Sequence, residues 1–202
     1  MSERPSWRRW WPGQSDHAAR RAAERLYDEL VKQARTPVFY RDLGVPDTPE
    51  GRFEVVGLHA ALLLRHLRAA GAMGRAVGQA LFDRMFADMD ESLRQLGIGD
   101  LSVGKYVKRL ARNFYARIAA LDEALDEALA KGGTAPFEPL LQTNVYHGGP
   151  KPSAAQLRAL ADYLIEVDRA LAERSPTPLL QGDVVFRAPL ATNQSGAMAA
   201  AS

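Results

Sequence analysis

Apolar residues recur every three to four positions along most of the chain, which is the spacing of one face of an α-helix. Residues with this spacing occur at 16–34, from Pro49 to a turn at Gly71, at 73–96, 103–129 and 153–171, and more briefly from Pro139 to Tyr146. Val184–Phe186 is the one short run that suits an extended chain. The pattern predicts an all-α protein, built as a single irregular helical bundle of about six helices with a short extended C-terminal segment.

The helix that follows Pro49 is expected to be the central one. Thr48 is a suitable N-cap, and a proline is favoured at the first helical position. Apolar residues occupy most sides of this helix, and its polar stripe is narrow, with Glu54, Arg65 and Arg68 on one side. A helix that is apolar nearly all round is buried by its neighbours.

The chain divides into a Trp/Arg-rich leader at residues 1–15, a single helical domain at 16–188 and a tail at 189–202 that is expected to be disordered. The leader contains all three tryptophans, and its Trp7, Arg8, Arg9, Trp10 and Trp11 have the chemistry of a bilayer interface. They are predicted membrane contacts. The alternative is a helix that packs its tryptophans on the domain.

Composition narrows the function classes. The 202 residues are 47% hydrophobic and 25% charged, which is typical of a soluble globular chain, and no apolar stretch approaches the roughly 20 residues of a membrane-spanning helix. The absence of cysteine excludes disulfides and thiolate chemistry. The cytoplasm is therefore the expected location, with a peripheral place at the inner membrane if the leader binds lipid. No cofactor or metal site is predicted.

Charge is unevenly distributed along the longest predicted helix. Residues 101–117 hold five basic residues and no acid, whereas residues 118–140 hold five acids and one lysine. This order opposes the helix dipole, so helix stability alone does not explain it. Lys108, Arg112 and Tyr115 share one face and suit an acidic protein or RNA phosphate. The alternative is a solvated face that pairs with the acidic helix before it.

Two polar residues on otherwise apolar faces are candidates for a function. His59 is either a core histidine with satisfied ring nitrogens or a functional polar contact near the Pro-rich connector, the segment from Pro37 to Pro49. Asp88 lies at the edge of an apolar seam, where pairing with Arg84 four residues earlier is the structural alternative. No hydroxyl, histidine or second carboxylate is placed to complete a catalytic dyad or triad, so no catalytic residue is predicted.

An ordered series of motifs resembles the ubiquinol–cytochrome c chaperone family. The motifs are residues 44–48 (GVPDT), 51–54 (GRFE), 58–59 (LH), 82–83 (FD), 85–90 (MFADMD), 99–103 (GDLSV), 114–115 (FY) and 144–146 (NVY). The resemblance implies a non-enzymatic assembly factor for the cytochrome bc complex, respiratory complex III, which binds newly made cytochrome b. In mitochondria the family also works with a small partner protein near the ribosomal exit tunnel, and the sequence leaves open whether either applies here.

The resulting prediction is a helical chaperone that binds cytochrome b or its nascent chain. The predicted partner-binding residues are Asp47, Phe53, His59, Asp88, Lys105, Lys108, Arg112 and Tyr115. Two alternatives stay open: an RNA- or ribosome-binding module built on residues 105–117, and a small-ligand protein with a pocket near His59 and Asp88.

Overall fold

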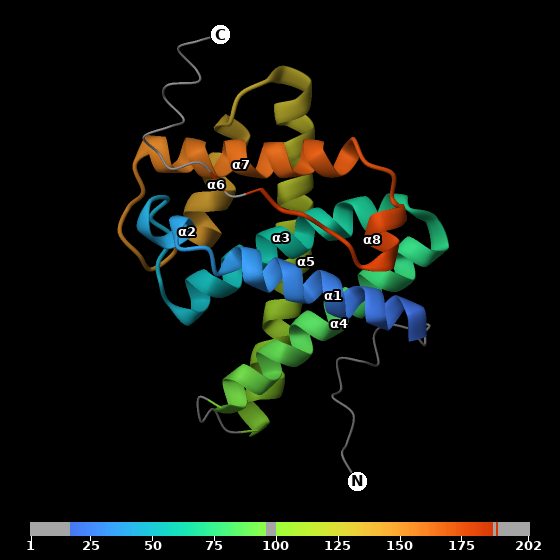
Figure 1. The fold of residues 1–202 in the computed structure, drawn as a ribbon. Helices are drawn as coiled ribbons and strands as arrows, with labels where there is room; N and C mark the ends of the chain where they lie inside the picture. Colours follow the sequence, from blue (N-terminus) through green and yellow to red (C-terminus); the bar gives the residue numbers. More distant parts are fainter. Residues whose placement is uncertain (1–16, 96–99, 188, 190–202) are drawn as a thin grey trace.

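The fold is a bundle of helices of very unequal length (Figure 1). The computed structural model describes residues 17–95, 100–187 and 189, with the backbone alone for residues 93 and 100–112. The elements are α1 (His17–Ala34), α2 (Val38–Arg41), α3 (Pro49–Ala69), α4 (Gly71–Gln95), α5 (Asp100–Lys131), a 3₁₀ turn η2 (Ala135–Phe137), α6 (Glu138–Leu140), a π-helical turn η3 (Leu141–Val145), α7 (Ala154–Ala172) and α8 (Thr177–Gln181). The described part of the chain contains no strand, which confirms the predicted all-α class.

Local sequence signals fix several helix ends. The Thr48 side chain accepts a hydrogen bond from the Gly51 amide at 3.1 Å and so caps α3, as predicted. Ser153 and Gln156 form a reciprocal capping box at the start of α7. The turn predicted at Gly71 is tighter than expected, because α4 already begins at Gly71, whose positive φ of 74° reverses the chain directly after Ala70.

Helix α3 lies at the centre of the molecule, as its composition predicts. Every residue from Gly57 to Leu64 is buried, a stretch of more than two helical turns. Helices α1, α4, α5 and α7 all contact it and cover its different sides. Any polar side chain on α3 must therefore find its partners inside the protein.

Helices α4 and α5 form an antiparallel pair that extends from the rest of the bundle (Figure 1). The second half of α4 and the first half of α5 reach beyond α1, whereas the second half of α5 passes behind α3 and α7. We call residues 100–115 the outer half of α5 and residues 116–131 its inner half. The long helix thus joins a projecting part of the molecule to its core.

After α8 the chain runs extended over residues 183–187, a segment called the strap below. It crosses α3 in the space between α1 and α7 (Figure 1). The predicted extended run, Val184–Phe186, lies within the strap, although it pairs with no strand in the described structure. The predicted leader lies outside the described residues, and so does nearly all of the predicted tail.

Two glycines of α3 offer a matched test of this packing. A Cβ atom on Gly51 would lie 2.0 Å from the carbonyl oxygen of Pro46, whereas a Cβ on Gly57 would make an ordinary contact of 3.5 Å with Phe114. We expect Gly51→Ala to lower the free energy of unfolding by about 1–3 kcal/mol because backbone must move. Gly57→Ala should be neutral or stabilise by up to about 1 kcal/mol through helix propensity. Urea denaturation of both variants measures the difference. Equal effects would contradict the close approach of the Pro46 backbone to Gly51.

Candidate functional site

A buried chain of hydrogen bonds surrounds His59. The Nδ1 atom lies 2.7 Å from the carbonyl oxygen of Val55, and Nε2 lies 2.7 Å from the hydroxyl of Tyr163. A carbonyl can only accept, so Nδ1 carries the proton, and Nε2 accepts from the tyrosine. The tyrosine hydroxyl in turn accepts from Nε2 of Gln33 at 3.0 Å. This polar relay connects α3, α7 and α1.

Burial keeps His59 neutral. Its side chain is 1% exposed, and desolvation lowers its pKa to about 4. His59 is therefore the core histidine with satisfied nitrogens that the sequence offered as an alternative. It has no surface to offer to a partner in this structure, and any role in binding would be to position its neighbours.

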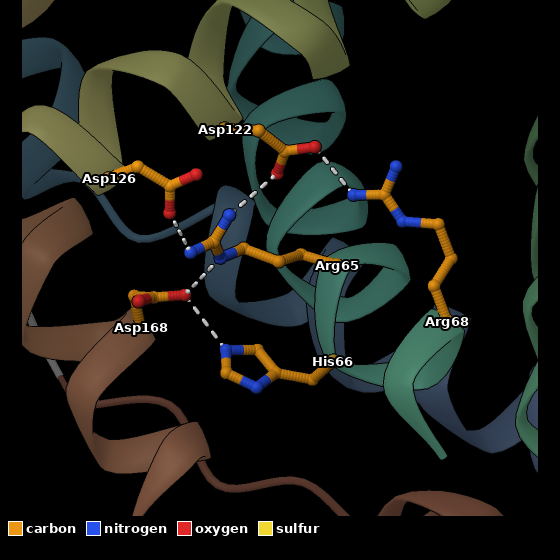
Figure 2. Close-up of polar contacts among 6 residues, drawn as sticks. All are labelled: Arg65, His66, Arg68, Asp122, Asp126 and Asp168. Atoms are coloured by element: carbon orange, nitrogen blue, oxygen red, sulfur yellow. Dashed lines mark hydrogen bonds and ion pairs between the residues drawn. The ribbon is translucent and has the colours of Figure 1, made fainter. Parts of the chain in front are cut away.

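A second polar cluster joins α3 to α5 and α7, as Figure 2 shows. The Arg65 guanidinium contacts Asp122 at 3.3 Å, Asp168 at 3.2 Å and Asp126. Arg68 contacts Asp122 at 2.6 Å, and His66 lies 2.8 Å from Asp168. The basic end of the stripe on α3 thus meets two acids of the inner half of α5. The unusual charge order along α5 has a structural reason in its second half.

The third polar group is at the other end of the α3 stripe. Glu54 forms an ion pair with Arg117, which also donates to the side-chain oxygen of Asn144 at 3.1 Å. Burial raises the pKa of Glu54 to about 7, and the nearby guanidinium opposes this shift. Arg117 therefore pairs inside the protein, although the alternative RNA-binding module of residues 105–117 includes it.

Asp88 lies apart from His59. Its carboxylate contacts Arg84 at 3.3 Å, the pairing that the sequence offered as an alternative, and accepts a hydrogen bond from the hydroxyl of Tyr27 at 2.9 Å. Arg84 also lies over the Tyr27 ring, 4.6 Å from its centroid. These contacts fasten α4 to α1. Among the described residues, His59 and Asp88 share no partner, since His59 bonds to α7 and Asp88 to α1.

The predicted residues at the start of α3 lie near the surface. Asp47 is exposed and forms an ion pair of 2.6 Å with Arg52, whose guanidinium lies over the ring of Tyr40. Phe53 is half-buried. These residues form a small polar and aromatic edge that is accessible to solvent.

Tyr115 is the exposed end of an aromatic cluster between α4 and α5. Its ring stacks on Phe82 with centroids 5.3 Å apart and an interplanar angle of 25°. Phe82 in turn contacts Phe86 and Phe114, both fully buried. Tyr115 itself is 43% exposed, which is unusual for a large side chain in a packed cluster. It therefore presents a fixed aromatic surface at the base of the projecting pair.

The remaining predicted residues, Lys105, Lys108 and Arg112, belong to the outer half of α5. Only their backbone is described, and it is helical, so positions 108, 112 and 115 follow one another at the spacing of one helix face. The predicted membrane contacts Trp7, Arg8, Arg9, Trp10 and Trp11 lie outside the described residues. Of the predicted site residues, Tyr115, Lys105, Lys108 and Arg112 share one helix.

The polar clusters around Arg65 and His59 were not identified from the sequence, although the sequence contains signals for the first of them. Asp168 lies within the apolar seam of its helix, next to Val167 and three residues before Leu171. Arg65 and Arg68 are one turn apart on α3, as are Asp122 and Asp126 on α5, a complementary spacing across two helices. No comparable signal in the sequence points to Tyr163 as the partner of His59.

Neither a metal site nor a membrane-spanning helix is found in what the structure describes. Across residues 17–95, 100–187 and 189, no three histidine, aspartate or glutamate side chains converge as metal ligands do. Within the same ranges, no helix combines the length and the apolar character needed to cross a bilayer.

Two aspartates that contact Arg65, Asp168 and Asp126, should contribute very differently to stability. Asp168 is 2% exposed, whereas the side chain of Asp126 is 67% exposed, although both contact the same guanidinium. Asp168→Ala should lower the free energy of unfolding by about 3–5 kcal/mol because Arg65 and His66 lose a desolvated partner. Asp126→Ala should cost less than about 1 kcal/mol. Urea denaturation measures both, and similar losses would contradict the role assigned to burial.

His59 predicts a pH dependence. Native His59 stays neutral down to a pKa of about 4, whereas an unfolded histidine protonates near 6.5. The unfolded state therefore binds an extra proton between these values, and this site loses about 3 kcal/mol of stability at most as the pH falls through them. The raised pKa of Glu54 has the opposite effect, because it makes the folded state more stable as the pH falls over part of this range. The contribution of His59 is therefore isolated by comparing the protein with a variant that lacks this histidine.

The appropriate variant is His59→Gln, which has no group that titrates at this position. The free energy of unfolding of the two proteins should differ most near pH 7, and the difference should narrow towards pH 4.5. A difference that is constant across this range would show that His59 does not titrate as described.

Comparison with known proteins places this architecture in a family. The family model described as ubiquinol–cytochrome c chaperone matches residues 41–186. The crystal structure of the Cbp3 homolog from Brucella abortus has the same fold, with a TM-score of 0.74 and 33% sequence identity over 88% of this chain and 93% of that chain.

Curated relatives agree with this match. Ubiquinol–cytochrome c reductase complex assembly factor 1 is 26% identical over 104 residues in Mus musculus and 28% identical over 105 residues in Drosophila melanogaster. These alignments cover 52% and 50% of this chain, but only 35% and 40% of the relatives, so the chain matches less than half of their length. The family expected from the sequence motifs is confirmed: the chain belongs to the ubiquinol–cytochrome c chaperone family.

Proposed function

We propose that this protein is a non-enzymatic assembly chaperone for ubiquinol–cytochrome c reductase, respiratory complex III. Family membership supports this function, as do the names of the curated relatives, which are assembly factors of that complex. The family is one of chaperones and not of enzymes. Within this function, the proposed client is newly made cytochrome b or its nascent chain.

The proposed client-binding surface is the outer half of α5, which includes Tyr115. The observation that carries it is the 43% exposure of Tyr115, which is held by stacking on Phe82. Aromatic side chains with a fixed orientation lose little conformational entropy on binding and often dominate the energy of an interface. Because Tyr115 lies on a projecting pair of helices, a large client can approach it.

Charge adds to this proposal. Residues 101–112 contain four basic residues and no acid. Two acids of the inner half, Asp122 and Asp126, are engaged by Arg65 and so support the bundle, whereas the sequence of residues 101–112 is basic. A basic helical segment next to an exposed tyrosine suits a client surface that is acidic and partly apolar.

The other predicted contacts have weaker support. Asp47 and Phe53 are accessible or half-buried at the start of α3, and Asp88 is partly exposed between α1 and α4. We propose that these three extend the contact area and that His59 acts indirectly by fixing Tyr163. Contact of the leader with the membrane, contact with the ribosomal exit region and a requirement for a small partner protein are further proposals that await a test, as is a peripheral place at the inner membrane facing the cytoplasm.

RNA is the second candidate partner, because the same four basic residues would suit a phosphate backbone. The two candidates differ in how binding responds to salt. Neutralisation of several phosphates makes affinity fall steeply with salt concentration, whereas a contact that also depends on an aromatic anchor is less sensitive.

Reversal of two charges tests the proposed surface. The tagged protein is captured from cells of its source in mild detergent, and cytochrome b is identified by mass spectrometry and by the spectrum of haem b. Lys108→Glu with Arg112→Glu should reduce recovery of cytochrome b by roughly tenfold or more because the basic segment would repel an acidic surface. Thermal unfolding should be unchanged.

Lys151→Glu with Arg158→Glu is the matched control, since both positions are exposed and neither belongs to α5. This control should recover cytochrome b as the unmodified protein does. Full recovery with the α5 variant would contradict the surface, and absence of cytochrome b from the unmodified, folded bait would contradict the client. Recovery of RNA that disappears as salt is raised would favour the second candidate.

A further inference from the structure

The strap has the geometry of a peptide bound in a groove. Its side chains alternate, with Val184 8% exposed, Val185 70% exposed and Phe186 half-buried against the core. Alternation of this kind is typical of an extended chain with one buried face. Here helices supply that face, because the strap crosses α3 between α1 and α7 (Figure 1).

The groove recognises the strap through both backbone and side chain. Nε2 of Gln33 donates to the carbonyl oxygen of Arg187 at 2.8 Å, so an amide on α1 binds the peptide backbone whatever the residue type. The same Gln33 is oriented by Tyr163 in the polar relay to His59. The ring of Phe186 meets the His59 ring edge to face at 5.1 Å. The buried relay thus forms the floor and one wall of the groove.

The strap is held by few interactions. Its backbone accepts from Gln33 at Arg187 and donates from Asp183 to the carbonyl of Pro178, but Val184, Val185 and Phe186 form no backbone hydrogen bond with the described residues. A cavity of about 70 Å³ remains beside it, bounded by α7 residues together with Val185 and Arg187. This volume exceeds the space for a single water, so the contact between the strap and α7 is not fully packed.

We propose that this groove is a second binding site, which takes an extended segment of a client polypeptide with apolar side chains at positions i and i+2, and that the strap occupies it when no client is bound. The occupant is inferred from the strap itself, which places two apolar side chains with this spacing into the groove. The site lies away from the outer half of α5 and does not depend on the identity of the client. Its test can therefore fail while the proposed function stands.

Single cysteines report whether the strap leaves the groove, because the natural chain contains no cysteine. Val184→Cys places a thiol on the buried side of the strap, and Val185→Cys places one on its exposed side. The rate of reaction with a thiol reagent is measured with and without a synthetic peptide of the sequence of residues 183–189. A tethered segment acts at an effective concentration of about 1 mM, so the peptide is used at several times that value.

Without peptide, the thiol of Val184→Cys should react roughly tenfold or more slowly than that of Val185→Cys, since it reacts only when the strap opens. Peptide should accelerate Val184→Cys towards the rate of Val185→Cys by keeping the groove occupied. Ala128→Cys, in the core on α5, reports global unfolding and should not respond. No acceleration of Val184→Cys, or equal acceleration by a peptide with Val184→Asp and Phe186→Asp, would overturn the proposal.

Binding of the fluorescently labelled peptide provides an independent measurement. Phe186→Ala in the protein weakens the strap and should raise peptide affinity by about tenfold, because a larger fraction of molecules has an open groove. Adding Gln33→Ala should reverse that gain by removing the amide that binds the peptide backbone. Unchanged affinity in folded Phe186→Ala would overturn the proposal. A peptide-sensitive dimer on gel filtration would do the same, because the strap of a second copy would then be the occupant.

Discussion

The whole arrangement depends on the burial of α3. A helix that is surrounded for more than two turns cannot leave a charge or an imidazole without a partner, since an unpaired polar group in such a place costs several kilocalories per mole. Several polar side chains of α3 therefore fix the positions of other helices. His59 requires Tyr163 on α7, Glu54 requires Arg117 on α5, and Arg65 requires acids from both.

This requirement explains why α5 has two halves with different tasks. The inner half supplies Asp122, Asp126 and Arg117 to the central helix, and these charges stabilise the fold. The backbone of the outer half continues beyond α1 (Figure 1). A charge order that is unfavourable for an isolated helix becomes favourable when the charges at one end form ion pairs with a neighbouring helix.

Sequence patterns predicted the elements well and their neighbours poorly. Helical periodicity and the Thr48 cap depend on residues that are close in the chain, and the structure confirms both. The pairing of Asp88 with Arg84 is equally local. By contrast, the contact of His59 with Tyr163 joins residues 104 positions apart, and periodicity identifies a buried face without identifying what covers it. The sequence also gives no sign that Arg117 pairs with Glu54, because that partner is 63 positions away.

The length of α5 has a mechanical consequence. A helix of 32 residues is about 48 Å long and is stiff on that scale. Its inner half is held to α3 by ion pairs with Glu54, Arg65 and Arg68, and its outer half extends beyond α1 (Figure 1). A force on the outer half would therefore act as a torque on these ion pairs, transmitted past the aromatic cluster of Phe82, Phe86 and Phe114.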